Sequence, residues 1–300
     1  MSFKPKRKQS SGGNGGGNFK YPAPAKDGNQ ACRVSLIVDL GIQDRPNYEE
    51  LYNKDDEKHQ NALENRGATI VVPEYGDNKG KEVISIPQSP KQGVAVFVDL
   101  VGATVDYGGE IGEKHYRYML NKSFKGDVSP ITFDAVPPKA EGGLWTFHGG
   151  SVLTKLAKAT GNTQIISEGD DNMDIEQLLG AACLIDLEVN VVKKGEREFT
   201  NVKHNALSGL IDGMAEPAEL MTDARLVTFD DATAEDIKFI RKDVKEKIKL
   251  AHNFAGSAME SAFKEAGLLD GTSAPQDAPS SEGSAPEAAA DDDFDDDVPF

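Results

Sequence analysis

Three stretches of this chain carry dense runs of β-branched and aliphatic residues, and they restrict it to a mainly β fold. They lie at 31–42 (ACRVSLIVDLGI), at 93–107 (GVAVFVDLVGATVDY) and at 183–207, where CLIDLEVNVV and REFTNVKHNAL flank a KKGE turn. Apolar and polar residues alternate along both arms of the last stretch, which is typical of a hairpin with one buried face. Gly102 interrupts the second stretch and predicts a bulge or a sharp bend there.

Both ends of the chain are too polar to contribute to a folded core. Residues 1–20 form a Gly/Ser-rich arm with five basic residues and no acidic residue, whereas residues 268–300 are rich in Ala, Pro, Ser, Gly and Asp. Neither segment holds enough apolar area to offset the entropy lost on ordering, so we expect a flexible basic arm and a disordered acidic tail. The net charge is −17, and residues 21–269 hold 28 basic against 40 acidic residues. Any nucleic-acid site must then be a local basic groove.

Shorter elements are predicted between the three main stretches of the sequence. Residues 44–66 have helical composition and predict a charged, exposed insertion, with Tyr48, Leu51 and Tyr52 on one helix face. Residues 67–92 predict a hairpin with loops, because Gly and Pro separate short apolar pieces. Two further strands are predicted at 115–124 and 130–137.

Helix signals follow in the second half of the chain. A helix is predicted from Ser151 to Gly161, and a second one over 172–183. Residues 233–266 predict one long helix or two joined helices, begun by a variant capping box at Thr233. The resulting organisation is a flexible arm (1–20), a mainly β domain with helical insertions (21–232), an amphipathic helical segment (233–267) and a linker with an acidic tail (268–300).

Several common classes of protein are not indicated. Cys32 and Cys183 lie in apolar runs and predict two buried thiols. No Cys-x-x-Cys or His-x-x-x-His spacing predicts a metal site, and the GGNGGG run lacks the Lys-Ser/Thr of a phosphate loop. We therefore expect no catalytic residue, no metal and no cofactor. No apolar run is long enough to span a membrane and the basic N-terminus lacks the apolar core of a signal peptide, so we expect a cytoplasmic protein without a membrane partner.

The last ten residues, DDDFDDDVPF, place six aspartates around Phe294 and end in Val298, Pro299 and Phe300. This segment resembles the acidic tail of bacterial single-stranded DNA-binding proteins. The resemblance implies that Asp295, Asp296, Asp297, Val298, Pro299 and Phe300, with a free terminal carboxylate, dock onto replication, recombination and repair enzymes. It also implies a five-stranded OB-type barrel, which the strand pattern suits. The hairpin CLIDLEVNVVKKGEREFTNVK is similar to that of phage single-stranded DNA-binding proteins, which implies a divergent, phage-encoded member acting in the host cytoplasm.

Binding of single strands without strong sequence preference requires aromatic surfaces that stack on bases and cations that contact phosphates. Aromatic and basic residues are interleaved at 116–125 and again on the last hairpin, and a basic residue lies in the first strand. The candidate DNA contacts are Arg33, Tyr116, Arg117, Tyr118, Lys122, Phe124, Lys193, Lys194, Arg197, Phe199 and Lys203. For the aromatic residues among them, burial in a core is an equally good interpretation.

Three functions stay open at this point. The first is a non-catalytic protein that coats and protects single-stranded DNA and recruits partner enzymes through its tail. The second is a decoy that imitates the tail of the host protein and binds no DNA, which the acidic balance of residues 21–269 favours. The third is a nucleic-acid enzyme without a readable motif. The oligomeric state does not follow from the sequence.

Overall fold

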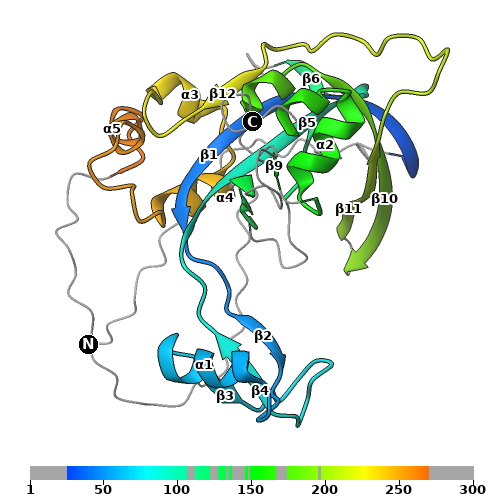
Figure 1. Ribbon diagram of the computed structural model, residues 1–300. Coiled ribbons are helices and arrows are strands. Elements are labelled where there is room, and N and C mark those ends of the chain that lie inside the picture. Colours follow the sequence, from blue (N-terminus) through cyan, green and yellow to red (C-terminus); the bar gives the residue numbers. More distant parts are fainter. Residues whose placement is uncertain are drawn as a thin grey trace, which may run out of the picture.

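The computed structural model describes residues 26–106, 112–121, 128–132, 135–136, 146–147, 149–166, 174–194 and 197–269 (Figure 1). Within these residues the fold is mainly β, as the sequence predicts. Helices cover the faces of one central sheet, and a smaller unit projects from one end of it (Figure 1).

The central sheet is open, largely antiparallel and seven-stranded. Its main path is β11-β10-β1-β5-β6; the short strands β12 and β7 pair with β1 and β5, and β12 alone runs parallel to its partner. The strands are β1 (Gly28–Gln43), β5 (Lys91–Asp106), β6 (Glu113–Met119), β7 (Ile131–Thr132), β10 (Ala182–Lys194), β11 (Arg197–Ser208) and β12 (Arg225–Val227).

One face of this sheet packs against helix α2 (Val152–Thr160) and two short 3-10 turns, η1 (Thr163–Ile166) and η3 (Ile175–Leu178). Ser151 caps the helix by accepting a hydrogen bond from the Thr154 amide, and Gly161 ends it in a left-handed conformation, as predicted. The core on this side joins Val34, Val98 and Ile185 of the sheet to Leu156 of α2. We call this side of the sheet the inner face.

The opposite side, which we call the outer face, packs against three short helices: α3 (Ala234–Lys238), α4 (Lys242–Lys249) and α5 (Ala258–Glu265). Their apolar stripe, predicted from the sequence, is buried against Leu36 and Phe97 of the sheet. The capping box at Thr233 and Asp236 is confirmed. The prediction of one long helix or two joined helices over 233–266 is wrong, because the chain turns at 239–241 and again at 250–257 and so forms three short helices.

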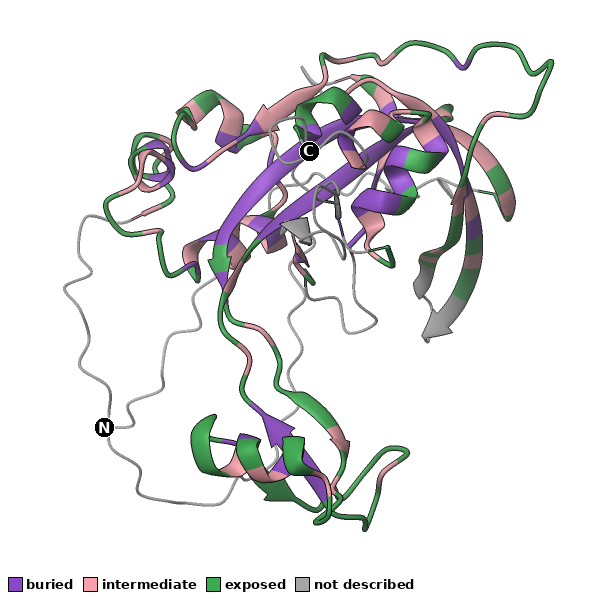
Figure 2. Cartoon of the chain, in the orientation of Figure 1, coloured by how far each residue is buried: buried purple, intermediate pink, exposed green. Residues whose placement is uncertain are grey.

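The insertion between β1 and β5 forms a unit with its own small core. Strands β2 (Tyr48–Leu51), β3 (Thr69–Val71) and β4 (Val83–Ile86) pair in the order β2-β4-β3, and α1 (Glu57–Asn65) covers one side. Figure 2 shows the insertion as mostly exposed, while β1 and β5 are almost continuously buried within the main sheet. A short two-stranded sheet of β8 (Ala135–Val136) and β9 (Thr146–Phe147) completes the strands.

Two sequence predictions in these regions need correction. Tyr48 and Leu51 lie in a strand rather than on a helix, because they pair with Ile86 and Val83 of β4. The helix expected over 172–183 is a single 3-10 turn, and Ala182 already pairs with Arg33 in the sheet. In both cases long-range pairing overrides the local helical composition. The predicted irregularity at Gly102 is confirmed, since the β5–β6 register shifts between Leu100 and Thr104.

Candidate nucleic-acid interface

A β-bulge in β1 introduces polar side chains into the outer face. Val34 pairs with Val98, but Leu36 pairs with Phe97, so Ser35 is an extra residue on β1. The bulge places Ser35 and Leu36 on the same side of the strand. Ser35 donates a hydrogen bond of 2.6 Å to the Asp99 carboxylate on β5, while Leu36 packs into the outer core.

Asp99 is buried, and Arg117 of β6 neutralises it. The guanidinium donates two hydrogen bonds, Nε to Oδ1 at 2.8 Å and Nη2 to Oδ2 at 3.3 Å. The Asp99 side chain is 5% exposed and that of Arg117 is 16% exposed. A bidentate, desolvated pair of this kind fixes the direction of the guanidinium. Arg117 is therefore held at the edge of the outer core, where it also reaches Thr222 at 3.5 Å.

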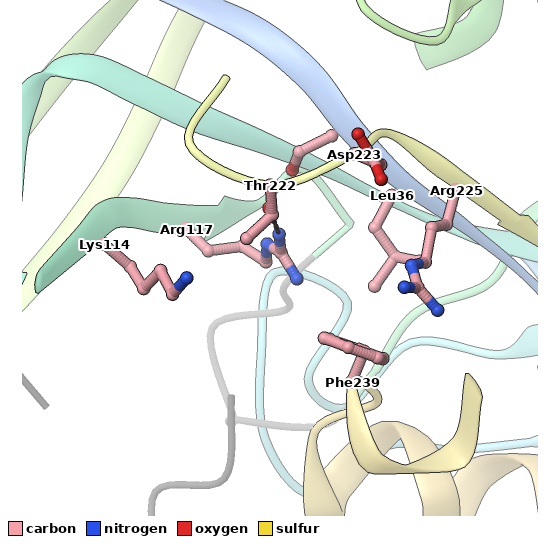
Figure 3. Close-up of a pocket in the computed structure, with 8 residues that line it drawn as sticks. Leu36, Lys114, Arg117, Thr222, Asp223, Arg225 and Phe239 are labelled. Atoms are coloured by element: carbon pink, nitrogen blue, oxygen red, sulfur yellow. Dashed lines mark hydrogen bonds between the residues drawn. The ribbon is translucent and has the colours of Figure 1, made fainter. Parts of the chain in front are cut away.

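Beside this pair lies a pocket of about 250 Å³ (Figure 3). It is formed by β1 and β6, by the segment that precedes and begins β12, and by the end of α3. The labelled side chains converge on one space, with Leu36 and Phe239 as apolar surfaces and Lys114, Arg117 and Arg225 as cations (Figure 3). The lining residues are Ser35, Leu36, Lys114, Arg117, Thr222, Asp223, Arg225 and Phe239.

Arg225 and Phe239 form a stacked pair within the pocket. The guanidinium carbon lies 4.1 Å from the centroid of the Phe239 ring, and Nη1 lies 3.3 Å from the carboxylate of Asp236. Asp236 is itself fixed by the capping box of α3. A planar cation on an aromatic ring is a surface on which a nucleobase can stack, and the cation can also contact phosphate.

A second set of polar contacts joins the outer face to residues 209–224, which connect β11 to β12 and which we call the strap. Arg33 of β1 donates hydrogen bonds to the strap carbonyl groups of Pro217 and Ala218, both at 3.0 Å. It also pairs with the carboxylates of Glu216 at 2.9 Å and Glu219 at 3.1 Å. Its remaining contact is the carbonyl of Gly180 at 2.8 Å. All three guanidinium nitrogens of Arg33 are therefore engaged within the protein.

The two ends of the main strand path come together at Tyr118 of β6 and His204 of β11. The tyrosine hydroxyl accepts a hydrogen bond of 3.0 Å from the His204 amide and lies 3.2 Å from Nδ1 of the imidazole. Burial raises the pKa of the Tyr118 hydroxyl, although the hydrogen bond from His204 opposes that effect. Burial also lowers the pKa of His204, and nearby Lys155 and Lys203 lower it further. The contact is therefore made by two neutral groups.

The predicted DNA contacts fall into three groups. Arg117 lies at the pocket, Lys203 is exposed on β11, and Arg33 is buried under the strap. Tyr118 belongs to the inner core and Tyr116 packs against it, so both lie on the inner face rather than at the pocket. The remaining predicted residues are outside the described part of the chain or have side chains that are not described: Lys122, Phe124, Lys193, Lys194, Arg197, Phe199 and Asp295–Phe300.

Lys114, Arg225 and Phe239 belong to the pocket but were missed as candidates in the sequence. They lie in three segments that are far apart in the chain, and nothing in the local pattern singles them out. A weak signal exists for Lys114, because it precedes the Tyr116–Tyr118 run. For the Arg225–Phe239 stack the only signal is tertiary, since it depends on where β12 and α3 meet.

Comparison of the chain with protein-family models, with curated proteins and with solved structures finds no match. In the described part of the chain, no group of three or more His, Cys, Asp or Glu side chains is arranged to hold a metal ion. The helices described there are also too short or too polar to cross a membrane.

Proposed function

We propose that this protein binds single-stranded DNA without strong sequence preference and recruits partner enzymes through its acidic tail. The observation that carries the proposal is the pocket on the outer face of β1 and β6. It combines the Arg225–Phe239 stack with the cations Lys114 and Arg117. Stacking and phosphate contacts are the two interactions that sequence-independent binding of single strands requires.

The strand path supports an OB-type arrangement. Taken in chain order, the five long strands β1, β5, β6, β10 and β11 lie as 5-4-1-2-3 across the sheet. A five-stranded Greek-key barrel that is partly open results when the two ends of such a path approach each other. The contact between Tyr118 and His204 joins those two ends. In OB folds the second and third strands, here β5 and β6, carry the binding face, and the pocket lies against β6.

The sequence of the tail supports the second half of the proposal. DDDFDDDVPF combines aspartates with two aromatic residues, and a basic pocket with an apolar floor on a partner protein suits both. The tail also carries the same sign of charge as DNA. It therefore competes with phosphates for the protein's own cations, and its removal tightens DNA binding.

A titration tests the proposal directly. Fluorescent oligo-dT and a matched duplex are added to the full chain and to a version that ends at Ala290, at about 50 mM and about 200 mM salt. We expect tight binding of the single strand, weaker binding of the duplex, a steep loss of affinity with salt and a gain on tail removal. Salt-independent binding, or none by either form, contradicts the proposal.

One observation favours the decoy function instead. The guanidinium groups of Arg33 and Arg117 are paired with carboxylates inside the protein, and residues 21–269 are acidic overall. A decoy competes for the tail-binding pockets of repair enzymes and binds no DNA. A competition assay with a labelled DDDFDDDVPF peptide on such an enzyme, together with the oligo-dT titration, separates the two functions.

A further inference from the structure

The strap is attached to the sheet by polar contacts and has almost no packing of its own. Of residues 209–224 only Pro217 is buried, while Ile211, Met214 and Met221 are between 42% and 66% exposed. The described backbone hydrogen bonds include one within the strap, from Met214 to Ile211, and none from the strap to the sheet. A segment with so few buried apolar contacts opens at low free-energy cost.

The polar contacts of the strap converge on basic side chains of the outer face. Arg33 holds Glu216, Pro217, Ala218 and Glu219 through four hydrogen bonds. Nε2 of the buried His115 donates to the carbonyl of Glu219 at 3.1 Å. Arg117 adds its contact with Thr222, so three basic side chains, one on β1 and two on β6, bind one segment.

The strap presents oxygen atoms that accept hydrogen bonds from these side chains, as the phosphates of a DNA backbone would. Carboxylate and carbonyl oxygens accept hydrogen bonds from Arg33 where phosphate oxygens could do so. The carboxylates of Glu216 and Glu219 are 73% and 85% exposed, so solvent screens both ion pairs and each is weak. The fit is also incomplete, because Nδ1 of His115 is buried without a hydrogen-bond partner among the described residues.

We infer that the strap is an internal substitute for the DNA backbone, which single-stranded DNA displaces from a binding track formed by Arg33, His115 and Arg117. This inference rests on the proposed function and extends the pocket along the outer face toward Arg33. DNA phosphates take over the hydrogen bonds that Glu216 and Glu219 make. Lys114 and the Arg225–Phe239 stack hold the strand beside the vacated surface.

The first test weakens the strap without touching the cations. Glu216→Gln and Glu219→Gln together remove both ion pairs to Arg33, and the affinity for oligo-dT should rise about three- to tenfold. The matched control, Glu64→Gln with Glu74→Gln, removes two exposed carboxylates from the insertion. If the control raises affinity as much as the strap variant, the gain is due to net charge alone and the inference is wrong.

The second test uses the unmodified protein. Cleavage after Glu219 by a glutamate-specific protease is followed by mass spectrometry with and without saturating oligo-dT. Displacement predicts faster cleavage at this site on DNA binding, whereas unchanged or slower cleavage overturns the inference. If no variant binds oligo-dT, the proposed function fails. If the protein binds oligo-dT but the strap is neither cleaved faster nor responds to the glutamate changes, only the strap inference fails.

Discussion

The two faces of the central sheet are both covered, but they are covered in different ways. The inner face, toward α2, is a mainly apolar core in which Val34, Val98 and Leu156 meet. The outer face is apolar where α3, α4 and α5 pack, and polar where Ser35, Asp99 and Arg117 form a buried network. Burying ionised groups costs free energy that an apolar side chain would avoid. We therefore propose that the residues of the outer face serve binding as well as folding.

Disrupting the inner face should have the largest effect on stability. Leu156→Ala removes a fully buried side chain and leaves a cavity, so the free energy of unfolding should fall by about 2–5 kcal/mol. Urea denaturation followed by circular dichroism measures the change, with Lys155→Ala on the exposed side of α2 as the control. The affinity of the remaining folded protein for oligo-dT should be unchanged, and a parallel loss of affinity would contradict the separation of the two faces.

Breaking the polar network of Ser35, Asp99 and Arg117 should have the next largest effect on stability. Asp99→Asn leaves the Arg117 charge without its buried partner and should lower the free energy of unfolding by about 3 kcal/mol. Adding Arg117→Met should recover most of that loss, because no unpaired charge then stays at the edge of the core. The double variant should nevertheless bind oligo-dT more weakly than the unmodified protein. Equal binding would show that the network is only structural.

The pocket should affect binding more than folding. Phe239→Ala removes the ring under Arg225, and one stacked base contributes about 1–3 kcal/mol, so affinity for oligo-dT should fall between about fivefold and about 150-fold. Tyr75→Ala, at an 82% exposed aromatic residue of the insertion, is the matched control and should change nothing. Fluorescence anisotropy on folded protein measures the affinity of both variants for oligo-dT. A larger loss of affinity in the control would indicate that the binding surface lies on the insertion.

The contact between Tyr118 of β6 and His204 of β11 should have the smallest effect on stability. The pKa of His204 is lowered in the folded state, so the unfolded chain takes up a proton that the folded protein resists as the pH falls below the ordinary histidine value. The stability contributed by His204 is therefore present above that value and is lost on acidification, by less than about 1 kcal/mol. The free energy of unfolding at about pH 7.5 and about pH 5.5 measures it. His204→Gln should lose this part of the pH dependence.

Local patterns in the sequence predict the strands far better than the site. Val, Ile and Leu runs locate β1 and β5, because burial on both sides of a strand leaves a dense apolar signature, and apolar/polar alternation locates the β10–β11 hairpin. The pocket depends on a bulge at Ser35 and on the meeting of β12 with α3, and neither is encoded within one window of sequence. Arg33 illustrates the difficulty: its residue type predicts a DNA contact, but only the fold reveals that the strap occupies it.

The attachment of the insertion has a consequence for how this chain could be shortened. Gln43 and Lys91 are paired directly across the β1–β5 ribbon, so the two residues that flank the whole insertion already lie opposite each other. A two-residue turn is sufficient to connect strands in such a register. The core of the insertion is separate from the cores of the sheet. We therefore expect that residues 44–90 can be replaced by Asn-Gly, which would close a hairpin at the end of the sheet.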